Sequence, residues 1–331
     1  MRAGARVAAG RGWNGLLAFS GVNNSVMHAD VPARVRERVV QLHRAAERPE
    51  SEYETLRAAL DGVPKAERRL RWRQIDILLD VHFRQCGPRV IRRLARLRAA
   101  HARRGTSERY DQFWAKVQEF LGDRTVTAHG YNLRPALRPA HELWSQVDEV
   151  VRALQGLGYE TFANSGTLLG LTRDDGIIWH DDDVDLAVLL HADTTKAAAI
   201  EWVRLRRKLR ASGVLDPEMD RRETIHTKTA SPDGLMLDLF PAWIRAGRLY
   251  VFPCCFGEVA AEDAIPLKPI SVDGSTNLLV PAKPEALLTA NYGRDWRTPD
   301  PLFTFDWTTA KRRFRRFRRI VRNRYGGSDA K

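Results

Sequence analysis

The chain has 331 residues, 44% of them hydrophobic, so it can bury a sizeable core as one large domain or two ordinary ones. Three cysteines, Cys86 and the adjacent Cys254 and Cys255, are too few for a disulfide framework and lack zinc-binding spacing, which fits a reducing cytoplasm. No stretch approaches eighteen apolar residues, so the sequence predicts no membrane-spanning helix. The net charge of +13 is concentrated near the C-terminus, because residues 311–324 hold nine basic and no acidic side chains and the remainder carries about +4.

The N-terminal third is predicted to be helical. Residues 1–29 begin with arginines and a weak apolar patch that is too short for a secretory signal, so we expect a disordered leader. Residues 30–122 show apolar residues at helical spacing, and Asp30 before Pro32 is a typical helix start. This region contains no catalytic pattern.

A linker is expected over residues 123–139 and a catalytic domain over residues 140–305. A helix from His141 to Leu157 leads into a short strand, and Ser165-Gly166-Thr167 then turns the chain into the next helix. The N–H groups at such a helix start can bind phosphate, and a glycine lets the phosphate approach the backbone. Ser165 and Thr167 are equally suited to simple helix capping. Arg173 offers a bidentate phosphate clamp, with a solvated arginine as the alternative.

An acidic run, Asp181-Asp182-Asp183-Val184-Asp185, continues directly into five apolar residues. Side chains alternate along a strand, so Asp181, Asp183 and Asp185 are expected on one face and Asp182 on the other. Carboxylates this close need a counter-charge, usually a divalent cation. A solvated turn would not continue into an apolar strand, and a calcium loop of the EF-hand type would need glycine where Leu186 stands. The run therefore predicts metal ligands at Asp183 and Asp185, with Asp181 as a further candidate.

Asp238 is the next acidic residue with a chemical signal. It stands inside the apolar run Leu235–Pro241, where a carboxylate is costly to bury without a partner. An edge-strand surface carboxylate is the alternative.

The segments Gly166–Gly170, Arg173, Gly176 and the acidic run together resemble the signature of the LicD/fukutin phosphotransferases, which are members of the nucleotidyltransferase superfamily. The ending Tyr292-Gly-x-Asp-Trp-x-x-Pro299 resembles the same family, and the likeness covers about residues 140–300. At the two positions before the acidic run this chain has Trp179-His180, where the family commonly has Pro-Trp. The resemblance implies an α+β fold, α/β-like, with a nucleotidyltransferase-type mixed β-sheet and flanking helices behind the N-terminal helical region. It also implies that Asp238 lies on a neighbouring strand, facing the Asp-x-Asp pair.

The resemblance further implies a Mg²⁺-dependent transfer of a phosphocholine or alditol-phosphate group from a CDP-linked donor to a glycan or glycolipid hydroxyl, with release of CMP. Asp183, Asp185 and Asp238 would be the catalytic and metal-binding residues, with Mg²⁺ or alternatively Mn²⁺ as the ion. Two other functions stay open: a nucleotidyltransferase that adds NMP from an NTP to a small molecule or nucleic acid, and a non-catalytic scaffold.

The C-terminal segment 306–331 is predicted to be a basic amphipathic tail. Phe314, Phe317, Ile320 and Val321 recur every three to four residues among arginines. Such a helix can lie on an anionic membrane through residues 311–324, which would place the protein at the inner membrane face. A solvated terminus is the alternative, and nucleic-acid binding is weaker because no recognised module accompanies the charge.

Overall fold

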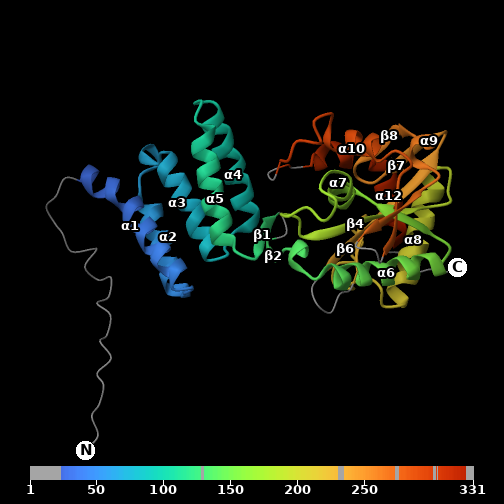
Figure 1. The fold of residues 1–331 in the computed structure, drawn as a ribbon, viewed down its shortest axis with the longest axis horizontal. Helices are drawn as coiled ribbons and strands as arrows, with labels where there is room; N and C mark the ends of the chain where they lie inside the picture. The colour runs from blue at the N-terminus through green and yellow to red at the C-terminus, as the bar shows by residue number, and fades with distance from the viewer. Residues whose placement is uncertain are drawn as a thin grey trace, which may run out of the picture. The chain divides into compact units, whose positions relative to one another are not determined.

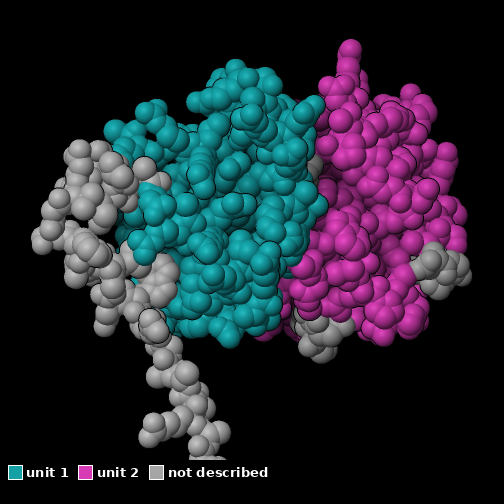
Figure 2. Space-filling model, turned by 60° about the vertical axis from the view of Figure 1, so that its left-hand side comes forward, with its two compact units in different colours: residues 1–121 teal, residues 122–331 magenta. Residues whose placement is uncertain are grey.

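The computed structural model describes residues 24–127, 130–229, 235–272, 276–300, 303 and 305–325. The chain divides into two compact units, residues 1–121 and 122–331, which are coloured separately in Figure 2. Most of the predicted leader, residues 1–23, lies outside the described residues.

The first unit consists of helices with a core of its own. Their bounds are α1 Asn24–Arg44, α2 Glu50–Gly62, the 3-10 turn η2 Lys65–Glu67, α3 Leu70–His82, α4 Gly87–Ala102 and α5 Ser107–Leu121. Helix α1 begins six residues before the predicted start at Asp30, so Pro32 lies inside the helix. A proline removes one helical hydrogen bond, and the buried residues that follow, Val35, Val39 and Leu42, hold this helix in the core.

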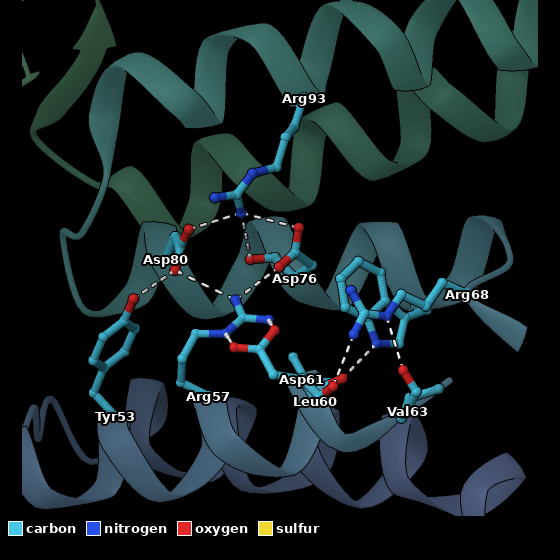
Figure 3. Close-up of polar contacts among 10 residues, drawn as sticks. Tyr53, Arg57, Leu60, Asp61, Val63, Arg68, Asp76, Asp80 and Arg93 are labelled. Carbon is cyan, nitrogen blue, oxygen red and sulfur yellow. Dashed lines mark hydrogen bonds and ion pairs between the residues drawn. The ribbon is translucent and has the colours of Figure 1, made fainter. Parts of the chain in front are cut away.

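A network of charged side chains joins three helices of this unit (Figure 3). Asp76 and Asp80 of α3 are buried, and both form ion pairs with Arg57 of α2 and with Arg93 of α4. Tyr53 donates a further hydrogen bond to Asp80 over 3.0 Å. Removing one partner of such a buried pair leaves an uncompensated charge, so the network fixes the pairing of α2, α3 and α4.

The second unit is built on a mixed β-sheet of six strands among the described residues, in the order β3-β4-β6-β7-β8, with β5 also paired to β6. The bounds are β3 Glu160–Ala163, β4 Asp183–Leu189, β5 Thr227–Lys228, β6 Met236–Arg245, β7 Arg248–Val251 and β8 Cys255–Ala260. Strands β4 and β6 run parallel, and the other pairs are antiparallel. The predicted α+β class, with a helical region before a mixed sheet, is confirmed.

Helices lie around this sheet (Figure 1), and the same unit contains two small hairpins. The helices are α6 Ala140–Gly156, α7 Ser165–Arg173, α8 Thr195–Ala211, α9 Ala261–Ala264, α10 Pro284–Tyr292, α11 Trp307–Arg313 and α12 Arg315–Tyr325, with the 3-10 turn η3 Pro135–Leu137. The hairpins are β1 Arg124–Thr127 with β2 Gly130–Leu133, and β9 Lys268–Val272 with β10 Thr276–Val280. The first hairpin lies in the segment predicted to be a linker. A side chain from each of its two strands donates a hydrogen bond to Asp182, which ties the hairpin to the start of β4.

The C-terminal segment is part of the folded unit and not a separate tail. Phe314, Phe317 and Val321 are fully buried, and the ring of Phe317 stacks on Trp243 of β6 at 4.8 Å. The sheet therefore covers the apolar side chains of this segment, and contact of its basic side chains with an anionic membrane stays a prediction. Its basic side chains remain exposed.

In the part of the chain that the structure describes, no helix has the length and apolar character needed to cross a membrane.

Candidate metal and phosphate site

Strands β4 and β6 bring together the three carboxylates that the sequence singles out. Asp183 and Asp185 alternate on β4, and the parallel register places Asp185 beside Asp238 of β6. One oxygen of each of the three lies within 4.8 Å of the others. Their exposed fractions are 8%, 8% and 3%, so they meet in the interior of the unit. The predicted adjacency of the two strands is confirmed.

The electrostatics of this cluster favour a bound cation. Burial, together with the neighbouring charges of Asp185, Asp181 and Asp238, raises the pKa of Asp183 well above its ordinary value. Burial and the charges of Asp181 and Asp238 do the same to the pKa of Asp185. Each shift means that negative charge here is costly without compensation. Oxygen-only donors at this spacing suit Mg²⁺ or a similar hard divalent ion.

The first turn of α7, which contains Gly166 and Thr167, holds Asp185 in place. The Gly166 N–H donates to Asp185 Oδ2 over 3.0 Å, and the Asp185 N–H donates to Thr167 Oγ1 over 2.8 Å. A Cβ added to Gly166 would lie 2.2 Å from Asp181 Oδ2, so this carboxylate occupies the space that glycine leaves open. The sequence predicts that Gly166 admits a phosphate, whereas in the structure its N–H and its open side serve the aspartates. Phosphate binding by the turn stays a prediction.

The remaining predicted phosphate ligands have other contacts. Ser165 Oγ lies 3.4 Å from Cys254 Sγ. Arg173 makes an ion pair with Asp174 at 2.8 Å and donates to the Trp296 carbonyl, so its guanidinium is largely committed. The structure does not place Arg173 in direct contact with the carboxylate cluster.

Lys228 and His226 also lie beside the carboxylates, and no sequence pattern marks either residue as part of the site. Lys228 of β5 stands opposite Asp238 in the ladder, is buried, and pairs its Nζ with Asp238 Oδ1. His226 Nε2 lies 3.8 Å from Asp238 Oδ2, and its ring stacks on Phe240. Lys228 lies on β5, which has only two residues, and His226 directly precedes that strand, so no periodic pattern could have marked either side chain.

Asp182 precedes β4, and one of its carboxylate oxygens lies within 4.8 Å of oxygens of Asp181 and Asp183. The predicted separation of Asp182 onto the opposite face is therefore not observed. Asp182 Oδ2 accepts hydrogen bonds from Thr127 Oγ1 and Asn132 Nδ2, each at 2.7 Å. Asp182 therefore anchors the β1–β2 hairpin to the start of β4.

A cavity of about 260 Å³ adjoins the site. It is lined by Leu169, Arg173, Ile178, His180, Tyr292, Asp295, Trp296, Thr298, Asp300 and Phe303. Burial and the nearby charge of Asp185 raise the pKa of Tyr292, which places this wall of the cavity within electrostatic reach of the carboxylates. Tyr292 belongs to the C-terminal sequence pattern noted above.

The second unit thus combines a mixed sheet, a helix opened by a glycine, an Asp-x-Asp strand and a third aspartate on the next strand. These are the features that the resemblance to nucleotidyltransferases implies. Residues 158–278 match the family described as LicD/FKTN/FKRP, nucleotidyltransferase domain, so this segment is similar to that family. The chain is also similar to the ribitol-5-phosphate transferase FKTN of Mus musculus, with 24% identity over 222 residues. That alignment covers 61% of this chain and 41% of the mouse protein, so the chain spans less than half of that relative.

Proposed function

We propose that the protein is a phosphotransferase that moves a substituted phosphate from a CDP-activated donor to a hydroxyl of a glycan or glycolipid, with Mg²⁺ as cofactor and CMP as the leaving product. The observation that carries this proposal is the convergence of Asp183, Asp185 and Asp238 within 4.8 Å on two parallel strands. The domain family and the name of the mouse relative support transfer of an alditol phosphate, and the cytidine rests on that likeness.

The cluster fits the proposed ion because the carboxylates of Asp183, Asp185 and Asp238 meet within 4.8 Å, and the charge of Asp181 acts on Asp183 and Asp185. Asp183, Asp185 and Asp238 would hold the Mg²⁺, with Asp181 beside them. When bound, the ion neutralises charge on the donor phosphates and makes the acceptor hydroxyl more acidic.

The protein's own groups supply positioning and proton transfer. The Gly166 N–H and the Thr167 hydroxyl orient Asp185, and Lys228 orients Asp238. The acceptor oxygen attacks the phosphorus of the transferred group, the bond from that phosphorus to the CMP oxygen breaks, and Asp238 takes the hydroxyl proton. The cavity beside Tyr292 offers room for a further part of a substrate.

Product analysis tests this function. The full chain is incubated with Mg²⁺ and CDP-ribitol, CDP-glycerol or CDP-choline while CMP is measured, and in parallel with NTPs while pyrophosphate is measured. We expect CMP from at least one CDP donor and a loss of at least about 100-fold in Asp185→Asn. The exposed Asp193→Asn serves as the matched control and should keep its activity.

Pyrophosphate release without CMP would instead indicate a nucleotidyltransferase. Absence of both products over the whole panel would favour a binding protein that shares the fold.

A further inference from the structure

The positive charge of the protein is concentrated on two helical segments of the second unit. Helix α8 and the segment Trp307–Tyr325 hold 15 of the chain's 54 lysines and arginines but one of its 41 acidic residues. The rest of the chain, with 39 basic and 40 acidic residues, is nearly neutral. Helix α12 packs against α8, so these charges form one feature of the fold. We name it the α8–α12 basic surface.

Buried contacts fix this surface in place. The ring of Tyr325 lies 3.9 Å from the guanidinium of Arg206, which is itself buried and paired with Asp220. Arg207 and Arg222 donate to the carbonyls of Arg324 and Arg322, where the last turn of α12 leaves acceptors open. Helix α12 is therefore already folded against α8, and the surface does not have to form upon binding a partner.

The outward face of the surface is cationic. The exposed basic side chains of its helices are Lys196, Arg204, Lys208 and Arg210 of α8, Lys311, Arg312 and Arg313 of α11, and Arg315, Arg316, Arg319, Arg322 and Arg324 of α12. Arg313 pairs with Glu258, and the loop after α8 exposes Arg221 and Arg222 together with Glu218 and Glu223. The apolar side chains of α12 turn inward. The exposed face of α12 thus has no aromatic ring on which an unpaired nucleic-acid base could stack.

Exposed aromatic rings occur instead just before α12. Phe303 is 43% exposed and Trp307, the first residue of α11, is 40% exposed. Lys311 lies one helical turn after Trp307 and shares its helix face. In proteins that contact membranes, tryptophan side chains are enriched at the depth of the lipid headgroups, where arginine and lysine meet anionic lipids. Trp307 also lies 5.9 Å from His226, so this segment begins next to the carboxylate site.

We propose that the α8–α12 basic surface is a docking site for the anionic headgroups of a membrane, to which the folded protein binds by charge, without insertion of the apolar face of α12. The proposal stands on charge and packing and is independent of the transferase activity. Each arginine near an anionic leaflet strengthens binding by about fivefold. Replacing four of them should therefore weaken binding by more than about 100-fold.

The test is sedimentation of the full chain with vesicles of phosphatidylcholine containing 30 mol% phosphatidylglycerol, at low and at high salt. The variant Arg315→Gln/Arg316→Gln/Arg319→Gln/Arg322→Gln changes only exposed side chains of α12. Its matched control removes four exposed arginines of α4 and its C-cap: Arg89→Gln/Arg92→Gln/Arg96→Gln/Arg103→Gln. We expect the wild type and the control to bind these vesicles in low salt and to bind pure phosphatidylcholine vesicles only weakly. We expect the α12 variant to lose binding to the anionic vesicles.

Equal binding by the α12 variant and the wild type would overturn the proposal, as would failure of the wild type to bind anionic vesicles. A 20-base-pair DNA duplex is titrated at the same salt concentration. Tighter binding of the duplex than of the vesicles would also overturn it, in favour of a nucleic-acid partner.

Discussion

Gly166 has a steric role that its side chain, a single hydrogen, makes possible. A methyl group in Gly166→Ala would lie 2.2 Å from Asp181 Oδ2 and 3.5 Å from Asp185 Oδ2, so Asp181 must move. We expect at least about a tenfold loss of Mg²⁺ affinity, together with an overpacking cost of about 1–3 kcal/mol. Thermal unfolding with and without Mg²⁺ measures both effects. Gly156→Ala, which meets no atom within 4 Å, is the control, and an unchanged Mg²⁺ response in Gly166→Ala would contradict this role.

Lys228 offsets part of the charge of the cluster. In Lys228→Met the buried carboxylate of Asp238 loses its ammonium partner, so the metal-free protein should lose about 3 kcal/mol of unfolding free energy. Mg²⁺ would then supply the missing positive charge, and its addition should raise the Tm more in the variant than in the wild type. Lys196→Met, at an exposed position of α8, controls for the lost charge. A Mg²⁺ shift no larger than that of the wild type would count against this role.

The residues of the site differ in how far the sequence reveals them. Asp183 and Asp185 could be predicted because they alternate in an acidic run that leads into an apolar strand, where crowded carboxylates need a counter-charge. Asp238 could be predicted because a carboxylate inside an apolar run is costly to bury without a partner. Lys228 could not be predicted, because it meets Asp238 only through the pairing of strands β5 and β6, which the sequence does not reveal. Gly166 was expected to face a phosphate, since the sequence does not show that Asp181 folds back over the turn.

At the scale of elements, α12 is the clearest case in which the sequence predicts a helix but not its partner. The spacing of Phe314, Phe317 and Val321 gives the amphipathic period, yet a membrane and a protein core select the same period. The structure shows the core. The β1–β2 hairpin was missed for a different reason, because its four-residue strands are too short for a periodic signal and depend on Asp182.

The packing of α12 makes a stability prediction. Phe317 is fully buried and stacks on Trp243, so Phe317→Ala should lower the unfolding free energy of the second unit by about 3–5 kcal/mol. The exposed neighbour Arg319→Ala should change it by less than about 0.5 kcal/mol. Urea unfolding followed by tryptophan fluorescence compares the two variants. Equal midpoints would mean that α12 is not a structural part of this unit.

At the scale of the whole molecule, each of the two units has its own core, and the first has an acid-sensitive residue. His82 is buried and its Nε2 lies 2.9 Å from the Glu47 carbonyl, and burial lowers its pKa from 6.5 to about 4. Between pH 6.5 and about pH 4, the imidazole of His82 is therefore protonated in the unfolded chain but neutral in the folded unit. Its contribution to stability is present above pH 6.5 and is lost as the pH falls toward 4.

Amide hydrogen exchange in the full chain measures this pH dependence. Protection factors of α3 and α5, corrected for intrinsic exchange rates, should fall between pH 7 and pH 5. The fall should be smaller in His82→Gln, which has no titrating ring. An equal fall in both proteins would assign the acid sensitivity to other groups.

The central claim is that Asp183, Asp185 and Asp238 share one divalent ion. Isothermal titration calorimetry of the full chain with Mg²⁺ tests it most directly, with Asp238→Asn beside the exposed control Asp193→Asn. We predict saturable binding in the wild type and the control, and affinity at least about tenfold weaker in Asp238→Asn. Equal Mg²⁺ affinity in Asp238→Asn and the wild type would contradict the shared site.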